Sequence, residues 1–190
     1  MTRSPLLINN GWMPFMLGTI FIVMALFMFF YPLMTLILVP TISTLLFLLV
    51  ALFEVVFLLS NWEFNRPRFR IAIAGLFALI GIYLYTGYAE HYTIEYLPIL
   101  LGLWTALSGF LFFLTGYRLR LYQKRYTSGF IWFARAMILI GIMLFLVPIA
   151  TLYQLLMIAV GIILMAGFLY LWLGLICLQY REKKGVRYAK

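Results

Sequence analysis

Two charged residues lie inside long apolar stretches of the sequence, where an ionisable side chain is costly and is therefore a candidate for function. Glu54 lies six residues before the end of its stretch, and Arg135 lies six residues after the start of its own. At a rise of about 1.5 Å per residue, both would lie about 9 Å inside the same end of their helices. Equal depth and opposite charge predict an intramembrane ion pair between Glu54 and Arg135. Three roles are open: a staple between helices, a proton or ion relay in which Glu54 titrates, or an Arg135 side chain that reaches the lipid headgroups.

A second group of titratable residues lies in a polar segment between two apolar stretches, and consists of Glu90, His91 and Glu95. An unperturbed histidine titrates near pH 6.5, so a loop on the outer face would respond to external acid. The alternative is a solvated loop without a sensing role.

The remaining inventory of reactive side chains is short, because the chain has five acidic residues, one histidine and one cysteine, Cys177. A zinc site normally draws on three or four Cys, His or carboxylate ligands. The sequence contains no glycine-rich phosphate loop and no nucleophile elbow. We therefore expect no enzymatic activity, no cofactor, and no catalytic, cofactor-binding or metal-binding residues.

The composition predicts an all-α integral membrane protein. Of the 190 residues, 66% are hydrophobic and 10% are charged, whereas a soluble domain carries about 25% charged residues. A membrane-spanning helix needs about 20 apolar residues. Six transmembrane helices are predicted, at about residues 12–31, 36–60, 71–88, 96–117, 130–147 and 152–178.

Basic residues lie almost entirely in alternate connections, after the second and fourth stretches, and in the tail at 180–190. Because short cytoplasmic loops carry an excess of lysine and arginine, both termini are predicted to lie in the cytoplasm. The net charge of +9 is then a topology signal and requires no nucleic-acid partner. The expected partner is the lipid bilayer, with anionic lipids attracted to the basic cytoplasmic face.

The six stretches form three similar hairpins in a single membrane domain, at about residues 11–61, 70–118 and 129–179. Equivalent positions recur about every 58 residues, as in the series Ala51, Gly109 and Gly167. Two crossings per repeat make the repeats parallel, which predicts a pseudo-threefold axis along the membrane normal. Small residues allow close helix packing, and the glycines expected to do so are Gly102, Gly109, Gly116, Gly167 and Gly174.

The recurring glycines and prolines carry a family resemblance that covers about residues 11–178. The first, third and fifth stretches contain glycine at Gly18, at Gly75 with Gly81, and at Gly141, and two outer turns have proline, at Pro32 and Pro148. Together with the hairpin length and the heptad-spaced glycines, this pattern resembles the HdeD family of bacterial acid-resistance membrane proteins. Ala51 and Glu90 depart from it, at positions where the other hairpins have glycine and proline. The resemblance implies an inner-membrane protein tied to acid stress, and supplies no catalytic residues.

Three hypotheses for function follow. The first is a non-enzymatic membrane protein linked to acid or envelope stress, which acts through the bilayer or a protein partner. The second is a small proton or ion channel or transporter that uses Glu54 and Arg135. The third is an accessory subunit of a larger membrane complex, and self-association into a homo-oligomer is compatible with each. A channel would require polar groups in the bundle interior, and the few available are Thr44, Thr105, Ser108 and Thr115.

Overall fold

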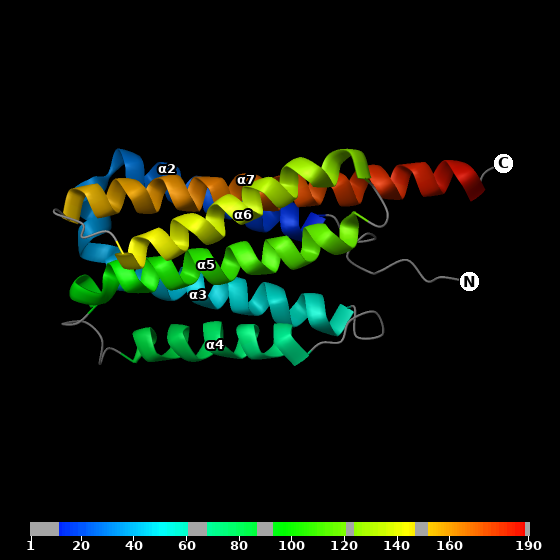
Figure 1. Ribbon diagram of the computed structural model, residues 1–190. Helices are drawn as coiled ribbons and strands as arrows, with labels where there is room; N and C mark the ends of the chain where they lie inside the picture. The colour runs from blue at the N-terminus through cyan, green and yellow to red at the C-terminus, as the bar shows by residue number, and fades with distance from the viewer. Residues whose placement is uncertain (1–11, 61–67, 87–92, 121–123, 147–151, 189–190) are drawn as a thin grey trace.

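The computed structural model describes residues 12–60, 68–86, 93–120, 124–146 and 152–188, and every regular element within these ranges is an α-helix. The chain folds into a bundle of long helices that lie along one common direction (Figure 1). Their bounds are α2 Trp12–Phe30, α3 Pro32–Ser60, α4 Arg68–Tyr85, α5 Thr93–Leu119, α6 Lys124–Leu146 and α7 Leu152–Tyr188.

Four of these helices contain stretches that are long and apolar enough to cross a membrane: Trp12–Phe30, Leu97–Leu119, Thr127–Leu144 and Tyr153–Leu178. The apolar parts of α3 and α4, Thr41–Val56 and Arg70–Tyr85, are shorter. Large apolar side chains remain exposed on the outer surface along the bundle, such as Leu33, Leu79 and Leu139. An apolar surface of this extent is typical of a protein that lies in a membrane.

The helix ends follow from local sequence. Pro32 begins α3 directly after α2, at a position where the missing N–H of proline costs no helical hydrogen bond. The Tyr31 carbonyl accepts a hydrogen bond from the Thr35 amide and another from the Thr35 hydroxyl, each at 2.9 Å. At the other end of the chain, α7 continues to Tyr188, through most of the segment predicted as a basic tail. Lysine and arginine are good helix formers and are favoured near a helix C-terminus, which accounts for this extension.

Successive helices run in opposite directions, so the start of α2 and the end of α7 lie at the same end of the bundle (Figure 1). The most extensive helix contacts join α2 with α7, α3 with α4, and α5 with α6. Contacts within the three predicted hairpins, α2 with α3, α4 with α5 and α6 with α7, are much smaller. The closest pairs are therefore formed between hairpins and not within them.

Glycines allow these close pairs. A Cβ atom built on Gly18 would lie 2.7 Å from the carbonyl oxygen of Gly167, and one built on Gly141 would lie 2.5 Å from the amide nitrogen of Ala106. At Gly109 the corresponding atom would lie 2.9 Å from the amide nitrogen of Ile138. In each case the neighbour is backbone, so a side chain at these positions would push two helices apart.

The core is formed by the inner faces of α3, α5 and α7. Buried positions recur on each at alternating steps of four and three residues, which is the spacing of a coiled-coil seam. On α3 they are Ser43, Phe47, Val50 and Glu54; on α5 they are Leu101, Thr105, Ser108, Phe112 and Thr115; on α7 they are Ala159, Ile163, Ala166, Tyr170 and Leu173. We call this buried core the central seam.

Candidate functional site

The central seam contains a buried ion pair between Glu54 near the end of α3 and Arg70 near the start of α4. Nη1 of Arg70 lies 3.6 Å from Oε2 of Glu54, and the two side chains are 4% and 3% exposed. Charges removed from both water and lipid headgroups are costly unless they are paired. The neighbouring ends of two antiparallel helices bring these opposite charges together.

Arg70 also binds the third helix of this region, α5. Its Nη2 atom donates to the backbone carbonyl of Leu111 at 3.3 Å and to the hydroxyl of Thr115. The Thr115 hydroxyl in turn donates to the same carbonyl at 2.8 Å. Because a guanidinium presents several donors in a fixed plane, one side chain from α4 bonds to α5 while it pairs with a carboxylate on α3.

Tyr170 of α7 lies in a cluster of aromatic rings that includes Phe53, the residue before Glu54. The Tyr170 ring contacts those of Phe53, Phe112 and Phe21, with centroid distances of 5.1, 4.6 and 5.6 Å. Tyr170 is itself buried, with 3% of its surface exposed. We call Glu54, Arg70, Thr115 and Tyr170 the charged centre.

The structure does not bring Glu54 and Arg135 together, so the predicted pair is corrected to Glu54 and Arg70. Arg135 lies on an exposed face of α6, and its guanidinium carbon lies 5.6 Å from the Phe113 ring centroid and 5.5 Å from that of Trp132. The reason is the rotation of α6 about its own axis. Ala134 and Met137 of this helix are fully buried, and Arg135, which follows Ala134, is turned outward.

The other predicted residues are placed as follows. Glu90 and His91 lie outside the described residues, and Glu95 lies in the first turn of α5, where side chains are not described. All five predicted packing glycines are buried, and three of them contact a facing helix closely: Gly109, Gly116 and Gly167.

Arg70 was missed by the sequence analysis because it was grouped with a basic loop. The available signal was its position directly before the apolar residues of α4, which places its long side chain within reach of the helix interior. The four polar residues named as interior candidates, Thr44, Thr105, Ser108 and Thr115, are all buried. The Thr105 hydroxyl donates to the Leu101 carbonyl at 2.6 Å, whereas Oγ of Ser108 has no hydrogen-bond partner among the described residues.

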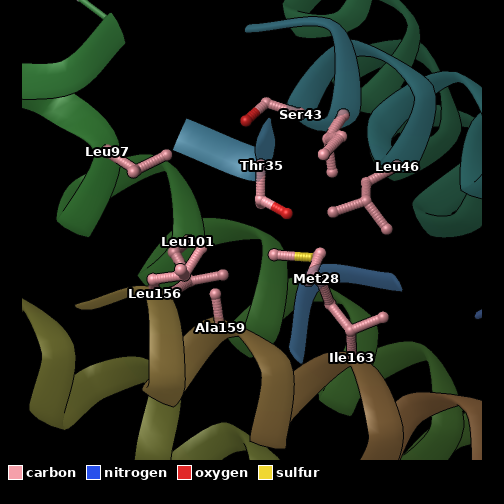
Figure 2. Close-up of a pocket in the computed structure, with 10 residues that line it drawn as sticks. Met28, Thr35, Ser43, Leu46, Leu97, Leu101, Leu156, Ala159 and Ile163 are labelled. Carbon is pink, nitrogen blue, oxygen red and sulfur yellow. The ribbon is translucent and has the colours of Figure 1, made fainter. Parts of the chain in front are cut away.

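A small cavity of about 40 Å³ lies in the seam at the end opposite the charged centre. Side chains from four helices point into it (Figure 2). Two of the side chains that line it are polar, Thr35 and Ser43 (Figure 2). The Thr35 hydroxyl donates a hydrogen bond to the Tyr31 carbonyl. The lining is otherwise apolar: Met28, Ile42, Leu46, Leu97, Leu101, Leu156, Ala159 and Ile163. This site offers no group for acid–base or nucleophilic chemistry.

Among the described residues, no group of three or more His, Cys or Glu side chains is arranged to hold a metal ion. Cys177 is a free, buried thiol in α7. No protein-family model, curated protein or solved structure matches the chain. The charged centre is therefore the site on which a functional argument can be built.

Proposed function

We propose that the chain is a non-enzymatic, multi-pass protein of a bacterial inner membrane that serves in acid or envelope stress, and that the charged centre is the clamp that holds its bundle together. The observation that carries the proposal is that Arg70 of α4 contacts two other helices. Its guanidinium pairs with Glu54 of α3 and donates to Leu111 and Thr115 of α5. Groups bonded to their own helices in this way suit a structural role better than a substrate site. The stress role rests on the resemblance to the HdeD family.

We further propose that all six helices span the bilayer, with both termini in the cytoplasm. Of the two helices with shorter apolar parts, α3 is longer than the bilayer core, and α4 is about 3 Å shorter, a mismatch that local thinning of the bilayer can accommodate. α3 has 29 residues and α4 has 18, which correspond to about 43 Å and about 27 Å at the helical rise, compared with a hydrocarbon core of about 30 Å. The basic residues Arg70, Arg118 and Arg120 all lie near one end of the bundle, which is the end we assign to the cytoplasm.

A pseudo-threefold arrangement is part of the same proposal. The three extensive helix pairs are related by a shift of two helices along the chain, with α7 and α2 closing the ring. Seam positions about 58 residues apart are buried together. One such set consists of Glu54, Phe112 and Tyr170, so the repeat carries an ionisable carboxyl in one copy and aromatic rings in the other two.

Two measurements test this proposal. Reporter fusions after residues in each connection should place the loops after α3 and α5, and both termini, in the cytoplasm. Expression of the chain in a bacterial host that lacks its own HdeD should raise survival after acid challenge, and a chain that inserts correctly without protecting the host would refute the stress role.

A second candidate function is proton transfer along the central seam, and a specific observation favours it. Each layer of the seam contributes a group that exchanges protons or hydrogen bonds: Ser43, then Thr105, then Ser108, then Glu54 with Tyr170, then Thr115. The unpartnered Ser108 hydroxyl lies one layer from Glu54. Successive layers are about 5 Å apart along the helices, and water molecules between these groups would have to complete the proton relay. The remaining alternative, an accessory subunit, is tested by stable copurification with another chain.

A further inference from the structure

Arg135 has no part in the charged centre, yet its surroundings are specific. Its side chain is exposed on α6 and lies between two aromatic rings, Phe113 of α5 and Trp132 of α6, at 5.6 and 5.5 Å from their centroids. Cation–π contacts of this kind hold a guanidinium in a fixed orientation while leaving its N–H groups able to donate.

The position of Arg135 along α6 requires a counter-charge. The membrane-spanning part of α6 is Thr127–Leu144, so Arg135 lies about 12 Å from its nearer end. A charged side chain at this depth is costly unless it meets an anion or water. Among the side chains that the structure describes, the sole carboxylate is that of Glu54, which is buried and paired with Arg70. An exposed guanidinium at this depth can therefore bind an anion that the surrounding bilayer supplies.

Two further residues extend this face toward the end of the bundle that we assign to the cytoplasm. Tyr117 and Arg120 follow Phe113 by four and seven residues, which places them on the same face of α5. Both are exposed. A polar and basic column thus leads from the level of Arg135 to the membrane surface.

In the opposite direction, the same face of α6 becomes wholly apolar. Leu139 and Ile142 follow Arg135 by four and seven residues, and both are exposed. The outer face of the α5–α6 pair is therefore basic and aromatic toward the end that we assign to the cytoplasm, and aliphatic toward the middle of the bundle. A phospholipid has the same order, with its phosphate at the membrane surface and its acyl chains directed inward.

We propose that the α5–α6 face binds one anionic phospholipid, with the phosphate held by Arg135 and Arg120 and an acyl chain along Leu139 and Ile142. The planar guanidinium binds a phosphate with two parallel hydrogen bonds, and Trp132 and Tyr117 flank the headgroup as interfacial aromatic residues do. Two cations on this face favour an anionic over a zwitterionic headgroup. The inference rests on the membrane insertion that we propose above, and is independent of the stress role.

The test uses the full chain purified in detergent and titrated with dioleoylphosphatidylglycerol or dioleoylphosphatidylcholine, with bound lipid counted by native mass spectrometry. We expect one phosphatidylglycerol to be retained in preference to phosphatidylcholine, and Arg135→Gln to weaken that binding about tenfold, as the loss of one charge-assisted phosphate contact implies. Arg118→Gln is the matched control, since it removes a charge of the same sign near the same end of the bundle, from a face of α5 other than that of Phe113, Tyr117 and Arg120. It should bind phosphatidylglycerol as the wild type does.

Equal retention of the two lipids by the wild type, or undiminished phosphatidylglycerol binding by Arg135→Gln, would overturn the proposal. If Arg135→Gln gives no folded protein, Arg135→Lys serves instead, because lysine keeps the charge but lacks the planar fork and should bind less tightly than the wild type. Wild-type affinity in Arg135→Lys would also count against the site. Reporter fusions establish insertion separately, so a correctly inserted chain without lipid selectivity refutes this inference alone.

Discussion

At the scale of single residues, the charged centre shows what a sequence cannot predict. The distance of a residue from its helix end can be counted in the sequence, but the direction in which its side chain points cannot. Glu54 and Arg135 were both predicted about 9 Å inside their helices, yet Arg135 packs on Phe113 of α5 and Glu54 pairs with Arg70 of α4. Depth depends only on the count of residues from a helix end. Whether two side chains meet depends on the rotation of each helix and on which helices are neighbours. α3 packs against α4, and so Arg70, not Arg135, provides the partner.

The residue-scale prediction concerns the removal of one charge from this pair. Glu54→Gln leaves the Arg70 guanidinium buried without its carboxylate, and breaking a buried pair on one side typically costs about 3–5 kcal/mol. We expect a lower folded yield and a lower midpoint of thermal unfolding in detergent. Glu54→Leu combined with Arg70→Leu should cost less than the single change, because no charge is then left unpaired.

Arg120→Gln is the control for this comparison, since it removes a charge from an exposed position at the end of α5. Surface changes of this kind usually alter stability by about 0.5 kcal/mol or less. If Glu54→Gln unfolds at the same temperature as the wild type and as Arg120→Gln, the pair is not a clamp, and the structural part of the proposed function is wrong.

At the scale of helices, much of the architecture could be predicted. The six apolar stretches correspond to six helices, with ends that differ by a few residues except at α7, which continues through the basic tail to Tyr188. Long apolar runs bounded by charge are a strong local signal. The pairing of α2 with α7, and of α5 with α6 across a basic connection, was not predicted, because it depends on contacts between distant parts of the sequence. The glycines were a partial signal, since they indicate where a helix packs closely against another but not which helix is its neighbour.

The helix-scale prediction compares two glycines in matched substitutions to alanine. A Cβ atom at position 141 would lie 2.5 Å from the Ala106 nitrogen and 2.8 Å from its Cα atom, whereas one at position 161 would meet nothing within 4 Å. Gly141→Ala must therefore separate α5 from α6, at a cost of about 1–3 kcal/mol, as for other overpacked cores. Gly161→Ala should be neutral or stabilise α7 by up to about 1 kcal/mol, because alanine is the better helix former.

Thermal unfolding of the two variants in the same detergent measures this difference directly. A higher midpoint for Gly161→Ala and a lower one for Gly141→Ala are expected. Similar midpoints for both variants would mean that α5 and α6 are not packed as closely as the distances at Gly141 indicate.

At the scale of the whole molecule, the two candidate functions differ in whether the central seam conducts. The seam is filled by large side chains in several layers, among them Phe47, Phe112 and Tyr170, all of which are buried. Its cavity of about 40 Å³ has room for little more than one or two water molecules. A hydrated potassium or chloride ion would need a continuous wet path, which such a packed interior does not offer. Protons alone could pass along hydroxyls and single waters.

We therefore expect purified protein in liposomes to give no potassium or chloride flux above that of empty liposomes, at neutral or at acid pH. If the charged centre is only a clamp, proton flux is absent as well. Proton flux that is lost in Ser108→Ala would mean that the centre acts in a relay and not as a clamp alone, because alanine removes the hydroxyl without adding an atom to the buried site and leaves the Glu54–Arg70 pair intact. Glu54→Gln should abolish the same flux if its carboxyl is the proton carrier, and Thr19→Val is the control, since this hydroxyl is exposed on α2 and bonded to the Phe15 carbonyl. Flux that persists in both Ser108→Ala and a folded Glu54→Gln protein would show that protons cross by a route outside the seam, and neither candidate would then describe how the bundle works.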